Sequence, residues 1–327
     1  MALVDNHDAI FLDLDGTVWE GGNALPHAVE AINAVSAPAL YITNNASRSA
    51  EQVAVMLREI GLRAESADVL TSAQAALQLA ASHLDPGDSV LVLGAESFRD
   101  LVVAAGYHAV DSADEEPKVV LQGHNPDTGW RQLSEAALAI RNGATYLASN
   151  LDTSLPSERG LMVGNGSMVA AVTSATGVVP QAAGKPEPAM FLQAANSVGA
   201  TRPLAVGDRL DTDIAGAVAA GIPVLHVATG VSGPIALLEA PKELRPTYVA
   251  EDLRSLHAEA EDLRPGRQGG FSARVDGNDI ILSHGKEGAT GMQALRTVLE
   301  VAWLMETPPE LVRPNSEAAE AATANWW

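Results

Sequence analysis

Four short polar segments, each following an apolar stretch, occur along the chain in a fixed order. They are FLDLDGT at 11–17, TNNAS at 43–47, GKPEP at 184–188 and GDRLDTD at 207–213. Buried parallel strands are short apolar runs, and ligands of open α/β sheets bind outside the carboxyl ends of such strands. The segments therefore predict an α/β fold, a doubly wound parallel sheet with polar side chains at its strand ends.

The first segment places two acids where the apolar run 9–12 ends. Side chains two apart on a strand share a face, but at the last turn the second side chain can swing away while its main-chain carbonyl stays behind. This suits Asp13 as a nucleophile and Asp15 as a proton carrier. Gly16 permits a tight turn that brings N–H groups to an anion, and Thr17 adds a donor. Taken alone, the segment is equally typical of an ordinary acidic loop.

The second and third segments supply groups that bind phosphate oxygens. Thr43 and Asn44 stand where a helix is predicted to begin, with Ser47 or Ser49 as its cap, and a helix N-terminus favours anions. Lys185 adds a cation. A polar turn and a solvated surface lysine are the ordinary alternatives, so these residues gain weight from occurring together.

The fourth segment brings further acids to another strand end. Asp208 follows an apolar run, and Asp211 and Asp213 crowd the same turn. Carboxylates in so small a volume repel one another unless a cation neutralises them, and oxygen ligands suit Mg²⁺. The histidines lack zinc-site spacing, and neither a P-loop nor a dinucleotide fingerprint is present.

Together these segments resemble the haloacid dehalogenase superfamily of phosphohydrolases, specifically its NagD-like branch, over about residues 9–250. The resemblance implies a Rossmann-like phosphatase core in which Asp13 attacks phosphorus and becomes an aspartyl phosphate, while Asp15 protonates the leaving alcohol and then activates water. It places Mg²⁺ between Asp13, the main-chain carbonyl of Asp15 and Asp208, with Asp213 as an outer partner.

The resemblance also implies that the phosphoryl group is held by four residues, and it assigns no role to Asp211. The four are Gly16, Thr43, Asn44 and Lys185.

The interval between the second and third segments is longer than one βα crossover needs, so it predicts an inserted α/β domain. Strands are expected at 90–93, 119–122 and 146–148, and helices at 98–105 and 130–141. NagD-like enzymes carry a cap domain at this place, which implies that it contacts the part of the substrate that is not phosphate. The predicted domains are a core at 1–71 and 181–253, a cap at 72–180 and an extension at 254–327. Candidate substrate contacts are His124, Asn125, Trp130, Asn150, Asp152 and Arg159 in the cap, with Arg48 and Arg209 beside the core motifs.

The extension is predicted to be a ββα unit. Residues 271–275 and 280–282 read as a hairpin and 292–305 as an amphipathic helix, after a linker at 259–268. The chain from Ala318 is expected to be frayed, with Trp326 and Trp327 possible docking points. A packing or homodimerisation role and a regulatory ligand site are both open.

Composition restricts the partners and the compartment. The 20 Lys and Arg residues stand against 41 Asp and Glu, a net charge of −21, so nucleic acid and anionic membranes are unfavourable partners. The absence of cysteine fits a reducing cytoplasm, and no signal peptide is evident at the N-terminus. The uncharged stretches 161–184 and 214–238 are broken by Gly, Pro, Ser and Thr, so we do not interpret them as membrane spans.

The substrate implied by the resemblance is a small phosphate ester, with glycerol 3-phosphate favoured, which would place the chain in glycerophospholipid metabolism. Nucleoside monophosphates, phosphoglycolate and pyridoxal phosphate are alternatives. A different class of function is a ligand-sensing or interaction protein whose phosphatase site is vestigial.

Overall fold

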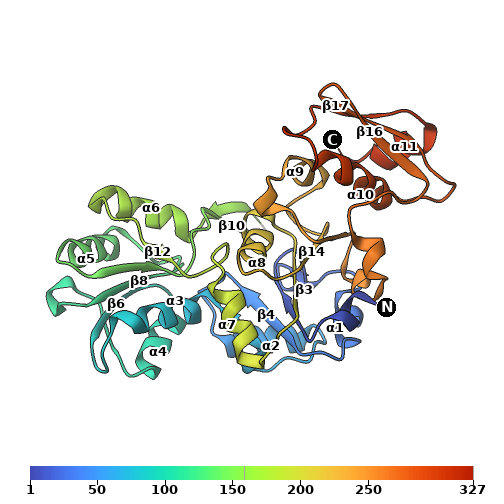
Figure 1. The fold of residues 1–327 in the computed structure, drawn as a ribbon. Coiled ribbons are helices and arrows are strands. Elements are labelled where there is room, and N and C mark those ends of the chain that lie inside the picture. The colour runs from blue at the N-terminus through green and yellow to red at the C-terminus, as the bar shows by residue number, and fades with distance from the viewer. Residues whose placement is uncertain (158, 327) are drawn as a thin grey trace. The chain divides into compact units, whose positions relative to one another are not determined.

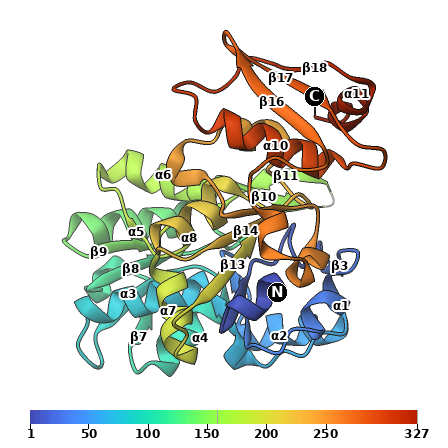
Figure 2. The same cartoon turned by 45° about the vertical axis from the view of Figure 1, so that its right-hand side comes forward.

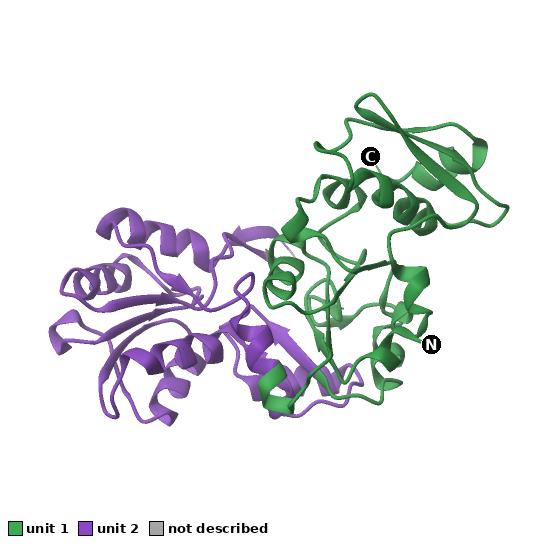
Figure 3. Cartoon of the chain, viewed as in Figure 1, with its two compact units in different colours: residues 1–39, 195–327 green, residues 40–194 purple. Residues whose placement is uncertain are grey.

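The computed structural model describes residues 1–157 and 159–326. The chain divides into two compact units, which are residues 1–39 with 195–327 and residues 40–194 (Figure 3). The cap and core boundaries expected from the sequence stay a prediction.

A parallel sheet forms the centre of the first unit, with strand order β15-β14-β13-β1. Its strands are β1 (Ala9–Leu12), β13 (Pro203–Gly207), β14 (Val224–Val227) and β15 (Tyr248–Ala250). Every residue of these strands is buried, as expected for parallel strands covered on both faces. β1 pairs with β13 so that Phe11 lies opposite Ala205. This register brings the beginnings of the first and fourth polar segments side by side.

Short elements complete this part of the first unit. They are the hairpin strands β2 (Trp19–Glu20) and β3 (Asn23–Ala24), the helices α1 (Ala28–Asn33), α8 (Ala215–Ala219) and α9 (Pro234–Glu239), and a π-helical turn at Leu210–Ile214.

The second unit begins with the parallel pair β4 (Ala39–Thr43) and β5 (Val69–Thr71), and α2 (Ala50–Glu59) lies between them in sequence. The hydroxyl of Ser49 accepts a hydrogen bond from the Gln52 N–H, and the Gln52 side chain accepts one from the Ser49 N–H. This reciprocal capping fixes where α2 starts, so of the two serines considered, Ser49 is the cap.

A five-stranded parallel sheet with order β12-β9-β8-β6-β7 forms the remainder of the second unit. Its strands are β6 (Ser89–Leu93), β7 (His108–Val110), β8 (Val119–Gln122), β9 (Thr145–Ala148) and β12 (Gln181–Ala182). The helices are α3 (Ser72–Ala80), α4 (Glu96–Ala104), α5 (Trp130–Arg141), α6 (Asn165–Thr176) and α7 (Ala189–Val198). Figure 1 shows α5 and α6 on one face of this sheet and α3 and α4 on the other.

This arrangement confirms the predicted α/β alternation in the insert: the expected strands are β6, β8 and β9, and the expected helices are α4 and α5. The short strand β7 was not predicted. A small hairpin, β10 (Ser154–Ser157) with β11 (Gly160–Val163), is also present in this unit.

The C-terminal extension contains the predicted hairpin and helix, as β16 (Phe271–Asp276), β17 (Asp279–His284) and α10 (Gly291–Ala302). Two further elements were missed: β18 (Val312–Pro314), which adds a third strand in parallel to β17, and α11 (Glu317–Thr323). Figure 2 shows α10 lying along the three-stranded sheet. The prediction of a frayed end was wrong, because α11 covers that stretch and Trp326 is buried.

The extension is fastened to the rest of the first unit by buried polar contacts. The Arg296 guanidinium on α10 donates to the Val249 carbonyl at 2.7 Å, and burial lowers its pKa to about 10. Arg264 stacks 4.7 Å from the centre of the Tyr248 ring. The segment 259–268 is therefore packed, and the prediction of a linker there was wrong.

Among the residues that the structure describes, no helix has both the length and the apolar character needed to cross a bilayer. The two uncharged stretches instead contain short strands, turns and helices, as the sequence indicated.

The apolar face of α10 provides a test of how the extension is stabilised. Leu299 is fully buried and Leu304, just beyond the helix, is 85% exposed. We expect Leu299→Ala to lower the free energy of unfolding by about 2–5 kcal/mol, because it leaves a cavity. Leu304→Ala should change it by less than about 0.5 kcal/mol. Denaturant titrations followed by tryptophan fluorescence will measure both, and equal effects would contradict this packing.

Candidate active site

Three carboxylates gather at the ends of β1 and β13, and we call Asp13, Asp208 and Asp213 the acidic group. One carboxylate oxygen from each lies within 4.8 Å of the others. Asp208 is fully buried and Asp213 is 3% exposed, whereas Asp13 is half-buried. The parallel register of β1 and β13 produces this meeting, since Leu12 lies opposite Val206 and both strands end within two residues of that pair.

Three hydrogen bonds orient the two buried carboxylates of this group. The Val231 N–H donates to Asp208 Oδ2 at 2.6 Å, and Thr17 Oγ1 donates to Asp208 Oδ1 at 3.4 Å. The Arg209 N–H donates to Asp213 Oδ2 at 3.1 Å. Main-chain and hydroxyl donors orient a carboxylate without neutralising its charge. Three like charges with two of them buried therefore favour a bound cation, and an all-oxygen set fits a hard ion such as Mg²⁺.

Asp15 is not among the three carboxylates of the acidic group, and the sequence allowed for its side chain to turn away from Asp13. Its side chain is exposed, and its Oδ1 accepts a hydrogen bond from the Trp19 indole N–H at 3.0 Å. Gly16 follows with φ of +89°, and a Cβ there would stand 2.7 Å from Asp208 Oδ2. The predicted tight turn is present, and only glycine fits it.

Asp211 points away from the acidic group and pairs with Arg209. The guanidinium contacts both carboxylate oxygens, at 2.8 and 3.1 Å, and these hydrogen bonds hold the pKa of Asp211 below its usual value. Arg209 was a candidate substrate contact, and in this structure it binds its neighbour two residues along the chain.

A loop that the sequence interpretation missed encloses Asp208. In this 228–233 loop, the Thr229 hydroxyl donates to the Gly16 carbonyl at 2.6 Å and the Ser232 N–H donates to the Asp208 carbonyl at 3.2 Å. A Cβ on Gly230 would lie 2.0 Å from Asp208 Oδ2, so the backbone itself forms the wall. The loop therefore fixes both the main chain and the carboxylate of Asp208.

His226 on β14 also supports Asp208 and was likewise missed. It is fully buried, and its Nε2 lies 3.2 Å from the Asp208 carbonyl oxygen. Because a carbonyl only accepts, Nε2 must carry the proton. Burial lowers the pKa of His226 to about 4, so the ring is neutral at pH 7.

The signal for this loop was present in the sequence. The largely apolar run 223–227 is followed closely by Thr229 and Gly230. A strand followed by small polar residues is the same pattern that identified the other segments. The loop carries no charge, and for that reason it read as an ordinary turn.

In the second unit, the structure brings Asn44 and Lys185 together. The Asn44 side chain accepts from the Lys185 N–H at 2.8 Å and donates to the Lys185 carbonyl at 2.9 Å. Lys185 is 3% exposed, and its ammonium donates to the Ile42 carbonyl at 3.1 Å. Gly184 makes the approach possible, since a Cβ there would stand 2.7 Å from Asn44 Oδ1.

Two more residues fix the main chain at Asn44. Ser72 Oγ donates to its carbonyl at 2.6 Å and Asn150 Nδ2 donates to the same oxygen at 2.7 Å. Asn150 was predicted as a substrate contact; it is buried and serves this network in the structure. Thr43, also buried, accepts from the Asn45 N–H at 3.1 Å.

The other cap candidates occupy varied positions. Asp152 accepts a hydrogen bond from Asn44 Nδ2 at 3.2 Å, and Asn125 donates to the Gly94 carbonyl at 2.9 Å. Partial burial lowers the pKa of His124. Trp130 is 82% exposed at the start of α5, and Arg48 and Arg159 are exposed as well.

Comparison with known proteins agrees with this architecture. Two family models match the chain, "Haloacid dehalogenase-like hydrolase" over residues 10–108 and "HAD-hyrolase-like" over 182–256. A D-glycerol 3-phosphate phosphatase from Mycobacterium tuberculosis is 42% identical, covering 99% of this chain and 95% of the relative. An acid sugar phosphatase from Staphylococcus aureus is 37% identical over 78% of this chain and 98% of its own length.

A solved structure extends the likeness to the whole fold. The crystal structure of a glycerol phosphate phosphatase from M. tuberculosis in complex with magnesium matches with a TM-score of 0.95 and 43% identity, covering 100% of this chain and 98% of the other. The chain belongs to the haloacid dehalogenase-like hydrolase family.

The 228–233 loop makes a direct prediction about Asp208. We expect Gly230→Ala to lower the free energy of unfolding by about 1–3 kcal/mol, because the added methyl group must displace the carboxylate or the loop. Gly266→Ala is the control, since a Cβ there meets its nearest neighbour only at 3.9 Å. Urea denaturation of both variants without added metal tests this, and a Gly230→Ala protein as stable as wild type would show that the loop does not confine Asp208.

Proposed function

We propose that the chain is a Mg²⁺-dependent phosphomonoester phosphatase acting on a small phosphate ester, with glycerol 3-phosphate as the substrate. The observation that carries the proposal is the acidic group, in which two buried carboxylates and one half-buried carboxylate converge where β1 and β13 end.

The residues present fit the cation that this chemistry requires. Asp13 and Asp208 would hold Mg²⁺ through carboxylate oxygens, together with the main-chain carbonyl of Asp15, and Asp213 would bind from outside. When bound, the ion neutralises charge on the phosphate and on the acidic group.

Asp13 is the nucleophile in this proposal. Its half-buried carboxylate is the most accessible of the acidic group, whereas Asp208 is closed in by Val231, Gly230 and Thr17. Attack forms a bond from a carboxylate oxygen to phosphorus and breaks the bond from phosphorus to the alcohol oxygen. Water then cleaves the aspartyl phosphate and restores the carboxylate.

Asp15 carries the proton in both steps. Its side chain is exposed and is oriented by the Trp19 indole, so it is placed away from the acidic group and available to a leaving alcohol. It donates a proton to the alcohol and takes one from the water that follows.

Lys185, Thr43, Asn44 and Gly16 bind the phosphoryl oxygens in this proposal. The buried Lys185 ammonium supplies positive charge, and the main chain around Asn44 is held rigid by Ser72 and Asn150. Because the Asn44 amide is engaged by Lys185, its contribution to phosphate would come from its main-chain N–H.

The choice of glycerol 3-phosphate rests on the M. tuberculosis relative, which matches nearly the whole chain, including the C-terminal extension. The same choice supports a cytoplasmic role in glycerophospholipid metabolism. A net charge of −21 disfavours nucleic acid and anionic membranes as partners. A homodimer through the extension stays a prediction.

A panel of phosphate monoesters tests the substrate. With Mg²⁺ present, we expect kcat/KM for glycerol 3-phosphate to exceed that for phosphoglycolate, AMP and pyridoxal phosphate by about tenfold or more, since hydroxyl-binding groups reject esters that lack matching hydroxyls. EDTA should abolish turnover of every ester. A preference for AMP would reject the substrate while leaving the phosphatase chemistry intact.

Paired substitutions test the nucleophile. We expect Asp13→Asn to lower kcat by a factor of at least about 10³, because an amide does not attack phosphorus. Asp211→Asn removes a nearby carboxylate that pairs with Arg209 and is not part of the acidic group, and it should change kcat by less than about threefold. Circular dichroism will verify folding, and an active Asp13→Asn enzyme would show that the nucleophile is a different residue.

A further inference from the structure

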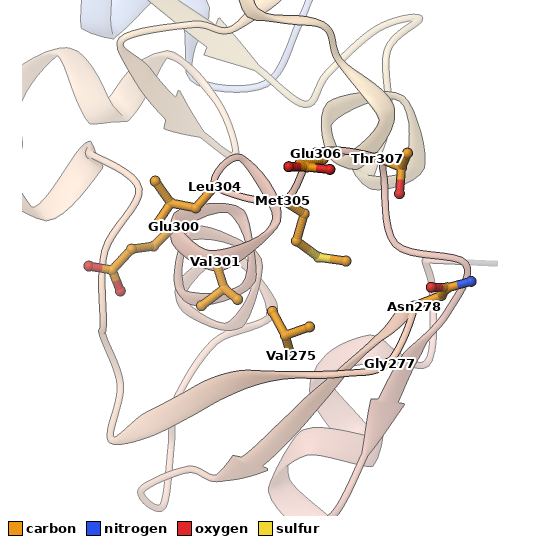
Figure 4. A pocket seen from close by; sticks show the side chains of 9 residues that line it. All are labelled: Val275, Gly277, Asn278, Glu300, Val301, Leu304, Met305, Glu306 and Thr307. Atoms are coloured by element: carbon orange, nitrogen blue, oxygen red, sulfur yellow. The ribbon is translucent and has the colours of Figure 1, made fainter.

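The C-terminal extension contains a cavity that the phosphatase chemistry does not use. It has a volume of about 540 Å³ and lies between the last turns of α10 and the turn joining β16 to β17. We call it the extension pocket; its lining residues are Val275, Gly277, Asn278, Glu300, Val301, Leu304, Met305, Glu306 and Thr307. Figure 4 shows Val275, Val301 and Met305 pointing toward one another across it.

Hydrogen bonds hold the two walls of the extension pocket in place. On one side, the Trp303 indole donates to the Leu237 carbonyl at 2.9 Å, and Arg245 donates to the Trp303 carbonyl at 2.7 Å. On the other, the side chain of Asn278 donates to Glu310 at 2.8 Å, and the Glu310 N–H donates to the Asn278 carbonyl at 2.9 Å. The pocket is therefore preformed, which reduces the entropy lost when a ligand binds.

The walls are apolar and open to solvent. Val275 is 47% exposed and Leu304 is 85% exposed, while Val301 and Met305 are half-buried. Apolar side chains gathered in a concave site gain free energy when a ligand removes them from water. Methionine also adapts its shape to different ligands.

The negative charge of the lining residues favours a cationic ligand. Glu300 and Glu306 are the two charged residues among the nine that line the pocket, and none of the nine is Lys, Arg or His. The negative end of the α10 dipole lies at the same place, at Ala302. A phosphate ester or a fatty acid would be repelled.

We propose that the extension pocket binds a small organic cation with an apolar body, of the alkylammonium class, with the apolar part against Val275, Val301 and Met305 and the ammonium group drawn by the negative charge of Glu300 and Glu306. This binding is independent of the phosphatase site. It gives the extension a ligand site of its own, which is one of the alternatives considered from the sequence.

Three probes of equal chain length test the proposal on the full-length protein: n-hexylammonium, n-hexanol and hexanoate. NMR titration of the methyl groups of Val301, Leu304 and Met305 measures binding and its location. We expect n-hexylammonium to bind at millimolar concentration, hexanol about two- to fivefold more weakly, and hexanoate weakest of the three, because an ion pair at an exposed site adds only modestly to binding.

Charge-neutralising variants distinguish the pocket from general attraction to an acidic protein. The pair Glu300→Gln and Glu306→Gln, made together, should weaken n-hexylammonium binding by about three- to tenfold. The matched control, Glu317→Gln with Glu320→Gln, removes the same charge from the exposed side of α11 and should change binding by less than about twofold. Equal losses in the two double variants, equal binding of hexanoate, or unshifted methyl signals would each overturn the proposal.

Discussion

The repulsion among the carboxylates of the acidic group is the constraint on which the rest of the site depends. Asp208 and Asp213 are almost entirely removed from water and lie within 4.8 Å of Asp13. Burying like charges together is unfavourable, so packing and hydrogen bonds must hold these carboxylates in place, and a bound cation would relieve their repulsion. The parallel pairing of β1 with β13 places Asp13 close to Asp208, and the 228–233 loop confines the Asp208 carboxylate.

Main-chain and hydroxyl donors contribute to the orientation of the acidic group. The Val231 N–H, the Thr17 hydroxyl and the Arg209 N–H each donate to a carboxylate of the group. Asp211 shows the contrast, because its charge is satisfied by the Arg209 guanidinium and it takes no part in the cluster. Two aspartates two residues apart on one turn are thereby directed to different partners.

In the second unit, hydrogen bonds between side chains and the main chain fix the position of a candidate site residue. Asn44 joins two segments that lie 141 residues apart, since its amide bonds both the N–H and the carbonyl of Lys185. Its own carbonyl accepts from Ser72 and Asn150. Asn44, which was predicted to bind phosphate, thus also holds the segment of Lys185 in place. Glycine precedes Lys185 because a side chain at position 184 would collide with the Asn44 amide oxygen.

The sequence by itself determined the α/β class, the strands that end in polar segments, the alternation of the insert and the hairpin with its helix, because apolar periodicity and glycine positions are local properties of the chain. It also identified the residues of the acidic group, since acids placed at strand ends are visible in one dimension. Only the tertiary structure decided that Asp211 pairs with Arg209 and that Asn150 is buried in a hydrogen-bond network. It also decided that the 228–233 loop and His226 enclose Asp208, and that β18, α11 and segment 259–268 are packed. Those outcomes depend on contacts between residues far apart in the chain, where packing and hydrogen-bond geometry select among partners that local pattern leaves equivalent.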